Sequence, residues 1–196
     1  MKERGVLVIT PWMDHFRFLA PVYDRLMGPP DVDHLCAHLG LPTNGWLLDV
    51  GGGTGRTSLP LRRMVRGVAV CDVSPPMLRR AHAREAVAVC APAERLPFPD
   101  RSFTRVLVVD ALHHFRNATD AVAEMVRVLA PGGRLVIAEF DLARRWVRWL
   151  ALAETLCGMR SRFFTAGEIG RLLAGCGLAA RIRRGRRLTT WVMADT

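Results

Sequence analysis

The sequence has one tyrosine and one lysine, and it has no long uninterrupted apolar run. A helix that crosses a bilayer needs about 18 consecutive apolar residues, whereas runs such as Val106–Val109 hold four. Residues 1–10 include an acidic residue and lack the apolar stretch and small-residue cleavage site of a signal peptide. We therefore expect a soluble, cytoplasmic chain.

The five cysteines are odd in number and scattered, and none of them forms a C-x-x-C pair. This distribution argues against a disulfide framework or a zinc site, and it suits a reducing cytoplasm. It also disfavours chemistry on a thiophilic metalloid such as arsenic, which would need several thiolates gathered at one site. We expect a protein without a bound metal.

The composition is that of one globular domain, with 196 residues, 50% of them hydrophobic and 23% charged. It excludes disorder, collagen and coiled coil. The charge is unusual, because 28 basic residues face 18 acidic ones and Lys2 is the only lysine. A positive field favours nucleic acid, an anionic membrane surface or acidic substrates, but it does not set the fold.

Apolar β-like runs alternate with helical patterns along most of the chain. Strands are expected at Trp46–Val50, Val68–Cys71, Ala86–Cys90, Arg105–Val109 and Arg134–Phe140. Helices are expected at Arg56–Arg66, Pro75–Glu85, Ala118–Leu129 and Thr165–Gly175, with Ser74 as the cap of the second and Pro131-Gly132-Gly133 as the stop of the third.

This alternation predicts an α/β, doubly wound fold with helices on both faces of a mostly parallel sheet. Two further β-like segments, Leu178–Arg183 and Arg187–Ala194, are joined by a short Arg-Gly-Arg connection and predict an antiparallel hairpin at one edge. We expect a Rossmann-like, seven-stranded sheet whose ligand lies at the carboxyl ends of the parallel strands.

A glycine cluster follows the first expected strand. A dinucleotide-binding G-x-G-x-x-G pattern that starts at Gly51 would need a glycine at position 56, which is Arg56. The spacing is instead G-x-G-x-G, and Asp49 stands two residues before it. An anionic side chain there would repel a pyrophosphate and attract an ammonium group, which disfavours an NAD-dependent oxidoreductase. The sequence also lacks a phosphate-binding loop of the GKS or GKT type.

A second acid, Asp72, ends the second expected strand. A carboxylate at this place can accept hydrogen bonds from both hydroxyls of a ribose. Together, Asp49 and Asp72 indicate a nucleoside with a free ribose diol, a positively charged appendage and no phosphates. S-adenosylmethionine has those features.

The glycine loop resembles motif I of the class I S-adenosylmethionine-dependent methyltransferases. The resemblance continues through residues 71–78, 93–100, 110–115 and 129–133. Residues 18–24 are similar to the N-terminal signature of the ubiquinone/menaquinone-biosynthesis (UbiE-like) branch, and residues 163–178 match its usual tail. The resemblance covers residues 16–194, and the order and spacing of the motifs make it specific.

The resemblance implies a role for each matching position. The glycines would line the methionine part of the cofactor, with Asp49 at its amino group. Asp72 would hold the ribose hydroxyls, and Val73 and Met77 would lie against the adenine. The complete cofactor-binding set implied is Tyr23, Asp49, Gly51, Gly52, Gly53, Gly55, Asp72, Val73, Met77, Ala93, Glu94, Asp110 and Ala111.

One position departs from the family pattern. Relatives usually have an aspartate before the Ala93-Glu94 pair, where it accepts from the adenine amino group, but this chain has Pro92. Proline offers neither a side-chain acceptor nor an N–H. Either Glu94 or a backbone carbonyl substitutes, or the adenine is held more loosely. We expect cofactor affinity in the weaker part of the family's range.

Two residues are candidates for the chemistry. Methyl transfer from a sulfonium is an in-line displacement, so positioning carries most of the catalysis. His113, after the fourth strand, is similar in position to the general-base histidine of some O-methyltransferases, and packing is the alternative for it and for His114. The resemblance places Tyr23 over the cofactor, and Asp110 and Ala111 beside the methionine and sulfonium.

The sequence does not decide which residue pairs with the carboxylate of the cofactor, or which segment covers the site. Arg17, Arg25 and Arg56 are each candidates to pair with the cofactor carboxylate. Leu142–Leu156 predicts an amphipathic helix with arginines on one arc and tryptophans on the other, which is either a lid or a membrane-surface helix. The Arg181–Arg187 run is a solvated edge that discourages aggregation.

We therefore expect one domain over residues 1–196 in four parts. A helical cap spans 1–45, the cofactor-binding core 46–140, the lid 141–164, and a C-terminal helix and hairpin 165–196. The predicted activity is methyl transfer to carbon or oxygen of a small organic acceptor, such as a quinol. An RNA or other nucleic-acid methyltransferase and a non-catalytic S-adenosylmethionine-binding protein are the alternatives. The oligomeric state is open between monomer and homodimer.

Overall fold

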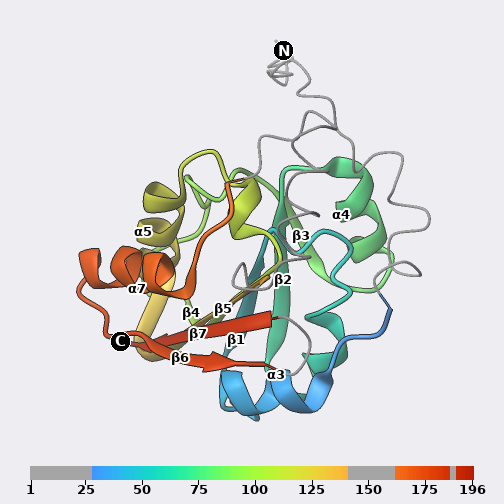
Figure 1. The fold of residues 1–196 in the computed structure, drawn as a ribbon. Helices are drawn as coiled ribbons and strands as arrows, with labels where there is room; N and C mark the ends of the chain where they lie inside the picture. The colour runs from blue at the N-terminus through green and yellow to red at the C-terminus, as the bar shows by residue number, and fades with distance from the viewer. Residues whose placement is uncertain (1–27, 141–161, 186–188) are drawn as a thin grey trace.

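Seven strands form a single mixed sheet. The computed structural model describes residues 28–140, 162–185 and 189–196. The strand order is β3-β2-β1-β4-β5-β7-β6 (Figure 1). The bounds are β1 Trp46–Val50, β2 Gly67–Asp72, β3 Val87–Cys90, β4 Phe103–Val109, β5 Leu129–Phe140, β6 Arg181–Arg184 and β7 Thr189–Asp195. Strands β1 to β5 pair in parallel, whereas β7 runs antiparallel to both β5 and β6. This confirms the predicted α/β fold class, including the C-terminal hairpin.

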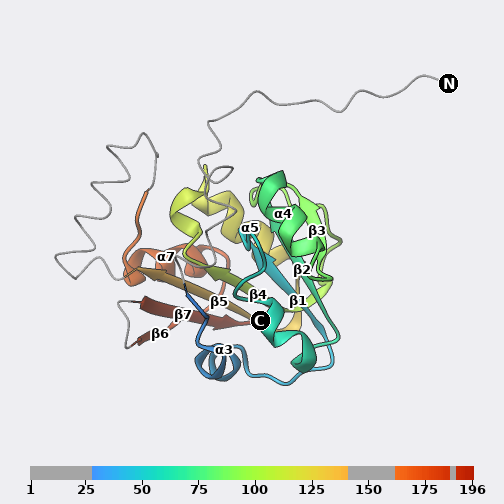
Figure 2. The same cartoon turned by 90° about the vertical axis from the view of Figure 1, so that its right-hand side faces the viewer.

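Helices cover both faces of the sheet. The α-helices are α3 Val32–Leu39, α4 Pro75–His82, α5 Ala118–Val128 and α7 Ala166–Gly175, and the 3₁₀ helices are η1 Leu59–Met64 and η2 Leu112–His114. Figures 1 and 2 show α5 and α7 together on one face and α3 on the other. Because successive side chains of a strand point to opposite faces, Leu48 packs into the core under α5 and α7, and Leu47 into the core under α3, η1 and α4. Asp49 therefore shares the face of Leu47.

Two arginines hold the carboxyl end of α3 against the sheet. The helix ends at Gly40, which has φ 63°. The side chain of Arg105 on β4 donates to the carbonyls of Leu39 and Gly40, and that of Arg134 on β5 donates to the carbonyl of His38. Cations suit this end of a helix because its last carbonyls lack partners within the helix. These bonds fasten α3 to the starts of two central strands.

The helix predicted at Arg56–Arg66 is wrong. The structure has a turn after the glycines and then the 3₁₀ helix η1, Leu59–Met64. Pro60 lies in its first turn, where it supplies no backbone donor. Ser74 does stand at the N-cap of α4, but its side chain makes no capping hydrogen bond.

The Pro131-Gly132-Gly133 stop also behaves differently from the prediction. Helix α5 ends at Val128, and the three residues lie inside β5, which begins at Leu129. Opposite them, the pairing moves from Phe103 with Leu129 to Arg105 with Arg134, so β5 carries extra residues in an irregular bulge. Gly132 has φ 71°, a backbone conformation that glycine adopts without strain.

Some predictions fall on residues outside the described part. The signature residue Tyr23, the arginines Arg17 and Arg25, and the amphipathic segment Leu142–Leu156 all lie in ranges that the structure does not describe. The four-part division of the chain is therefore still a prediction. None of the helices in the described ranges is long and apolar enough to cross a membrane.

Candidate functional site

Three acids meet at the carboxyl ends of neighbouring strands. Asp49 lies near the end of β1, Asp72 ends β2 and Asp110 follows β4, and β1 lies between β2 and β4 in the sheet. The backbone N–H of Gly51 donates to the carbonyl of Cys71 at 2.7 Å, and that of Gly53 donates to Oδ2 of Asp72 at 2.9 Å. The glycine loop therefore turns across the end of β2.

The loop needs glycine for close packing on its inner side. A Cβ on Gly52 would lie 2.4 Å from Cγ of Asp49, and one on Gly51 would lie 2.6 Å from Cβ of Ala111. Gly53 differs, because the nearest atom to its added Cβ is Oδ2 of Asp72, 3.9 Å away. The loop thus packs tightly against Asp49 and leaves space at Gly53.

Asp49 is a buried carboxylate without a full set of partners. Its side chain is 1% exposed, and its Oδ2 has no hydrogen-bond partner among the described residues. Burial raises the pKa of Asp49 to about 7, and the charge of Asp72 adds to that shift. A buried charge is costly unless it is paired, so a cationic group beside Oδ2 would stabilise the ionised form.

Asp110 presents a second such oxygen. Its φ is 50°, in the left-handed region, and its N–H donates to the carbonyl of Ala138 at 2.8 Å. Its Oδ1 is buried, with no hydrogen-bond partner in the described ranges. Burial, and then the charge of Glu139, raise the pKa of Asp110 to about 7.

Arg56 is a described arginine whose charge acts on both Asp49 and Asp110. Its charge lowers the pKa of Asp49 and of Asp110, although burial outweighs it in each case. Its Nη1 donates to the carbonyl of Gly28 at 2.9 Å, while its Nε is buried without a partner in the described part of the chain. Of the three arginines proposed for the cofactor carboxylate, Arg56 is the one that the structure describes.

Asp72 orders the loops around it. Its Oδ1 accepts from the N–H of Ser74 at 2.8 Å, and its Oδ2 accepts from the N–H of Gly53 at 2.9 Å. A carboxylate has about four lone-pair sites, so a side chain of this kind can accept from several donors at once. Next to it, Val73 is 67% exposed, which suits contact with a flat apolar ring, whereas Met77 is 3% exposed and packs inward.

The loop after β3 contains Pro92, the residue that replaces the usual aspartate. Ala93 is buried and Pro92 is exposed. Glu94 turns toward α5, because its Oε1 accepts from the N–H of Asn117 at 3.0 Å. One carboxylate oxygen is therefore already occupied, which weakens Glu94 as the substitute for the missing aspartate.

His113 is buried in a polar contact that the sequence analysis missed. The ring is 2% exposed, and its Nδ1 lies 2.6 Å from Oε2 of Glu139, which is equally buried. Phe163 stacks on it at 4.7 Å between ring centroids. The general-base role of His113 is untested by these contacts and stays a prediction. The available signal for Glu139 was a lone charged residue near the carboxyl end of an apolar strand.

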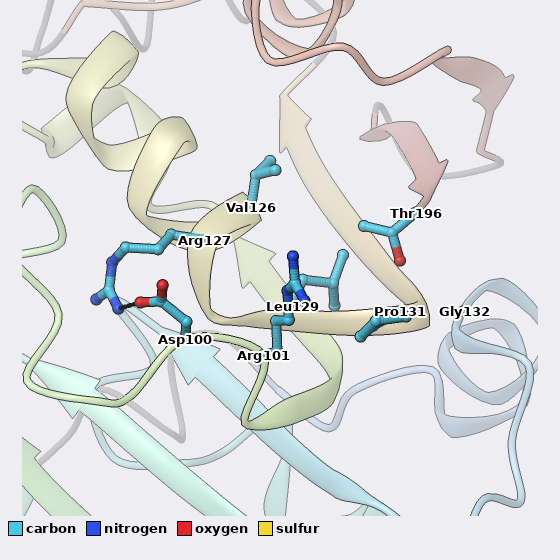
Figure 3. Close-up of a pocket in the computed structure, with 8 residues that line it drawn as sticks. All are labelled: Asp100, Arg101, Val126, Arg127, Leu129, Pro131, Gly132 and Thr196. Carbon is cyan, nitrogen blue, oxygen red and sulfur yellow. Dashed lines mark hydrogen bonds and ion pairs between the residues drawn. The ribbon is translucent and has the colours of Figure 1, made fainter.

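A separate pocket lies near the starts of β4 and β5, at the other end of these strands from the three acids (Figure 3). Its volume is about 470 Å³, and Asp100 and Arg127 form an ion pair of 2.6 Å on its wall. Its other lining residues come from the loop before β4, the end of α5, the start of β5 and the residue after β7: Arg101, Val126, Leu129, Pro131, Gly132 and Thr196. It shares no residue with the loops that carry the three acids.

The comparisons with known proteins identify the core. A family model described as a methyltransferase domain matches residues 48–137. Residues 48–137 therefore resemble a methyltransferase domain. The match spans β1 to β5 and includes Asp49, Asp72, Asp110 and the whole glycine loop.

Curated proteins similar to this chain carry names from quinone biosynthesis. The chain is 38% identical to the demethylmenaquinone methyltransferase of Tropheryma whipplei (strain Twist) over 116 residues, which are 57% of this chain and 48% of that protein. It is 37% identical to the ubiquinone/menaquinone biosynthesis C-methyltransferase UbiE of Pseudomonas fluorescens (strain SBW25), over 52% of this chain and 44% of that one. The chain thus spans about half the length of the curated relatives it matches. The resemblance seen in the motifs is confirmed.

A solved structure has the same fold. It is a SAM-dependent methyltransferase from Aquifex aeolicus, with a TM-score of 0.72, 18% identity, and coverage of 91% of this chain and 97% of that one. The match to a methyltransferase domain implies S-adenosylmethionine as the cofactor, and the described residues fit that molecule. The unpartnered oxygens of Asp49 and Asp110 suit its ammonium group, and Asp72 suits its ribose hydroxyls.

Proposed function

We propose that the protein is an S-adenosylmethionine-dependent methyltransferase that transfers a methyl group to carbon or oxygen of a small organic acceptor. The observation that carries this proposal is the set of three acids around one glycine loop, two of which hold buried oxygens without a hydrogen-bond partner among the described residues. Such oxygens are rare in folded proteins, and each needs an explanation. A ligand with an ammonium group and a ribose supplies one for the whole set.

The chain's own residues bind and orient the cofactor. Asp49 and Asp110 hold the ammonium group from two neighbouring strands, Arg56 is placed for the carboxylate, and Asp72 accepts from the ribose. When bound, S-adenosylmethionine supplies an electrophilic methyl group on a sulfonium. Because an in-line displacement needs the acceptor atom held opposite the sulfur, positioning is the protein's main contribution.

The acceptor that we favour is a quinol or a related metabolite. The curated relatives are named for demethylmenaquinone and for ubiquinone/menaquinone biosynthesis, and that is the support for this choice. Methylation of a quinol ring carbon needs a phenolate-like donor. We propose His113 as the base that forms it, with Tyr23 over the cofactor as the family signature implies.

We further propose that the enzyme acts in the cytoplasm, as a monomer or homodimer, with peripheral contact to a membrane. The four described cysteines, Cys36, Cys71, Cys90 and Cys176, are free thiols, which suits a reducing compartment. A lipid-tailed acceptor would account for the membrane contact.

Calorimetry tests the cofactor. S-adenosylmethionine and S-adenosylhomocysteine should bind at micromolar concentration, and NAD should not. Asp72→Ala should abolish binding, while Asp100→Ala, an exposed acid near the start of β4, should leave it unchanged. If wild-type protein binds neither S-adenosyl compound, the proposal fails.

Transfer of a labelled methyl group tests the acceptor. Demethylmenaquinol and simpler naphthoquinols should become labelled, and mixed RNA should not. Labelled RNA would support the nucleic-acid alternative, favoured by the net charge of +10. Cofactor binding without transfer to any acceptor in the screen would favour the non-catalytic alternative.

A further inference from the structure

Glu139 is a buried carboxylate near the carboxyl end of β5. It is 2% exposed and lies between Ala138, which is buried, and Phe140, which is half-buried. Burying a charge costs free energy unless hydrogen bonds compensate for it. A carboxylate buried at this position therefore needs a structural or functional explanation.

Among the described residues, the side-chain hydrogen bonds of Glu139 go to the loop that follows β4. Oε1 accepts from the N–H groups of Ala111 at 3.1 Å and Leu112 at 2.7 Å, and Oε2 contacts Nδ1 of His113 at 2.6 Å. The preceding residue of β5, Ala138, accepts from the N–H of Asp110 at 2.8 Å. The end of β5 thus fixes four consecutive residues, the first of which is Asp110.

The same loop also contacts the segment that begins at Arg162. The N–H of Arg162 donates to the carbonyl of His113 at 2.8 Å, and Phe163 stacks on the His113 ring. Glu139 therefore supports a junction between the cofactor edge and the C-terminal part of the fold. Because Asp110 has a φ of 50°, its backbone conformation depends on such support.

Glu139 also acts on Asp110 through its charge. The charged groups that act on Asp110 are Glu139 on β5, His113 in η2 and Arg56 in the glycine loop. After burial, the charge of Glu139 makes the largest contribution to the raised pKa of Asp110, and His113 and Arg56 each lower that pKa by a smaller amount. An ammonium group binds the ionised form of Asp110, so Glu139 influences the pH at which that form is available.

We propose that Glu139 is a positioning residue of the cofactor site: its carboxylate fixes the loop that presents Asp110, and its charge sets how readily Asp110 pairs with the cofactor's ammonium group. The proposal rests on the proposed function, because it requires that the site binds an S-adenosyl compound. Glu139 itself touches no part of the cofactor in this scheme.

Two substitutions separate the geometric part from the electrostatic part. Glu139→Gln keeps the length of the side chain and an oxygen for the two backbone N–H groups, but it removes the charge. Glu139→Asp keeps the charge but shortens the reach to the loop. Glu124→Gln is a matched control, since Glu124 also accepts from a backbone N–H, that of Leu96 at 2.8 Å, and lies away from the acid cluster.

The experiment measures the dissociation constant of S-adenosylhomocysteine by calorimetry from pH 5.5 to 8.5. In wild type, affinity should rise with pH as Asp49 and Asp110 ionise. In Glu139→Gln the rise should move to lower pH by about half a unit or more, because a neighbouring negative charge has been removed. In Glu139→Asp the midpoint should stay, while affinity falls about tenfold through loss of hydrogen bonds to a charged group.

Each outcome decides the proposal. An unchanged midpoint in Glu139→Gln, with affinity equal to that of the Glu124→Gln control, would overturn it. If Glu139→Gln does not fold, the Glu139→Asp profile decides, and wild-type affinity there would also overturn it. Absence of binding by wild-type protein at every pH would instead reject the proposed function itself.

Discussion

Asp49 makes the stability of the ligand-free protein depend on pH. The folded protein keeps a proton on this buried carboxyl up to about pH 7, whereas the unfolded chain loses it near pH 3.8. The folded state therefore binds more protons between these values, and the free energy of unfolding falls as pH rises through this window. Asp110 contributes in the same direction.

We expect Asp49→Asn to stabilise the ligand-free protein at pH 8, by on the order of 2–4 kcal/mol, because one pKa unit corresponds to about 1.4 kcal/mol. At pH 4 the substitution should change stability little. The same variant should lose affinity for S-adenosylhomocysteine, since an amide cannot pair with the ammonium group. Urea unfolding at both pH values checks the first part, and a variant less stable than wild type at pH 8 would contradict it.

The glycine loop allows a comparison between adjacent positions. Gly52→Ala should displace the Asp49 carboxyl, because the new Cβ would lie 2.4 Å from its Cγ. Gly53→Ala meets no atom closer than 3.9 Å and has only the strain of a φ of 55°, on the order of 1 kcal/mol. We expect Gly52→Ala to lower the melting temperature more than Gly53→Ala does, in the absence of ligand.

Individual site residues were predictable to different degrees. Asp49 and Asp72 could be assigned because both stand at the ends of expected strands and Asp49 stands two residues before the glycine cluster, features that the sequence shows directly. Glu139 could not, since its partners lie 26 to 28 positions away and depend on the pairing of β4 with β5. Met77 was expected against the ligand, and only the packing of α4 reveals that it is buried.

Helix α3 offers a prediction about one element. Arg105 binds the carbonyls of Leu39 and Gly40, and both lie at the carboxyl end of that helix. Arg105→Met keeps the aliphatic stem and removes these bonds. Hydrogen exchange of the α3 backbone amides should speed up about tenfold, as expected for loss of about 1.4 kcal/mol of local stability.

The control for this variant is Arg95→Met, which changes an exposed arginine in the loop between β3 and β4. It should leave α3 exchange unchanged. Equal acceleration in both variants would mean that the loss of positive charge, and not the hydrogen bonds to α3, is responsible.

Whole elements were easier to predict than their ends. The Val- and Leu-rich strands were recognised because a parallel sheet covered on both faces produces continuous apolar runs. The segment predicted as an α-helix at Arg56–Arg66 instead holds the shorter 3₁₀ helix η1, with Pro60 in its first turn. Pro131-Gly132-Gly133 reads as a helix stop, but the bulge that absorbs it depends on the partner strand.

The excess of positive charge has a consequence for the molecule as a whole. The chain carries +10, and β6 places Arg181, Arg183 and Arg184 at an exposed edge of the sheet. Arg181 pairs with Asp195, which leaves that edge positive overall. Such a surface attracts any polyanion without selecting one, and its self-repulsion opposes folding at low salt.

We therefore expect raising NaCl from about 20 to about 200 mM to increase the melting temperature of the ligand-free protein, since the Debye length falls from roughly 20 Å to below 10 Å.

Mixed RNA should associate at the lower salt concentration and dissociate at the higher one, because phosphate contacts weaken steeply with salt. Binding of S-adenosylhomocysteine should change little over the same range, since Asp49 and the buried oxygen of Asp110 are shielded from bulk ions. Fluorescence anisotropy of labelled RNA and calorimetry of the nucleoside, run in the same buffers, separate the two behaviours. RNA binding that persists at 200 mM and tightens when S-adenosylhomocysteine is added would reverse the conclusion, because a nonspecific field cannot couple the two ligands.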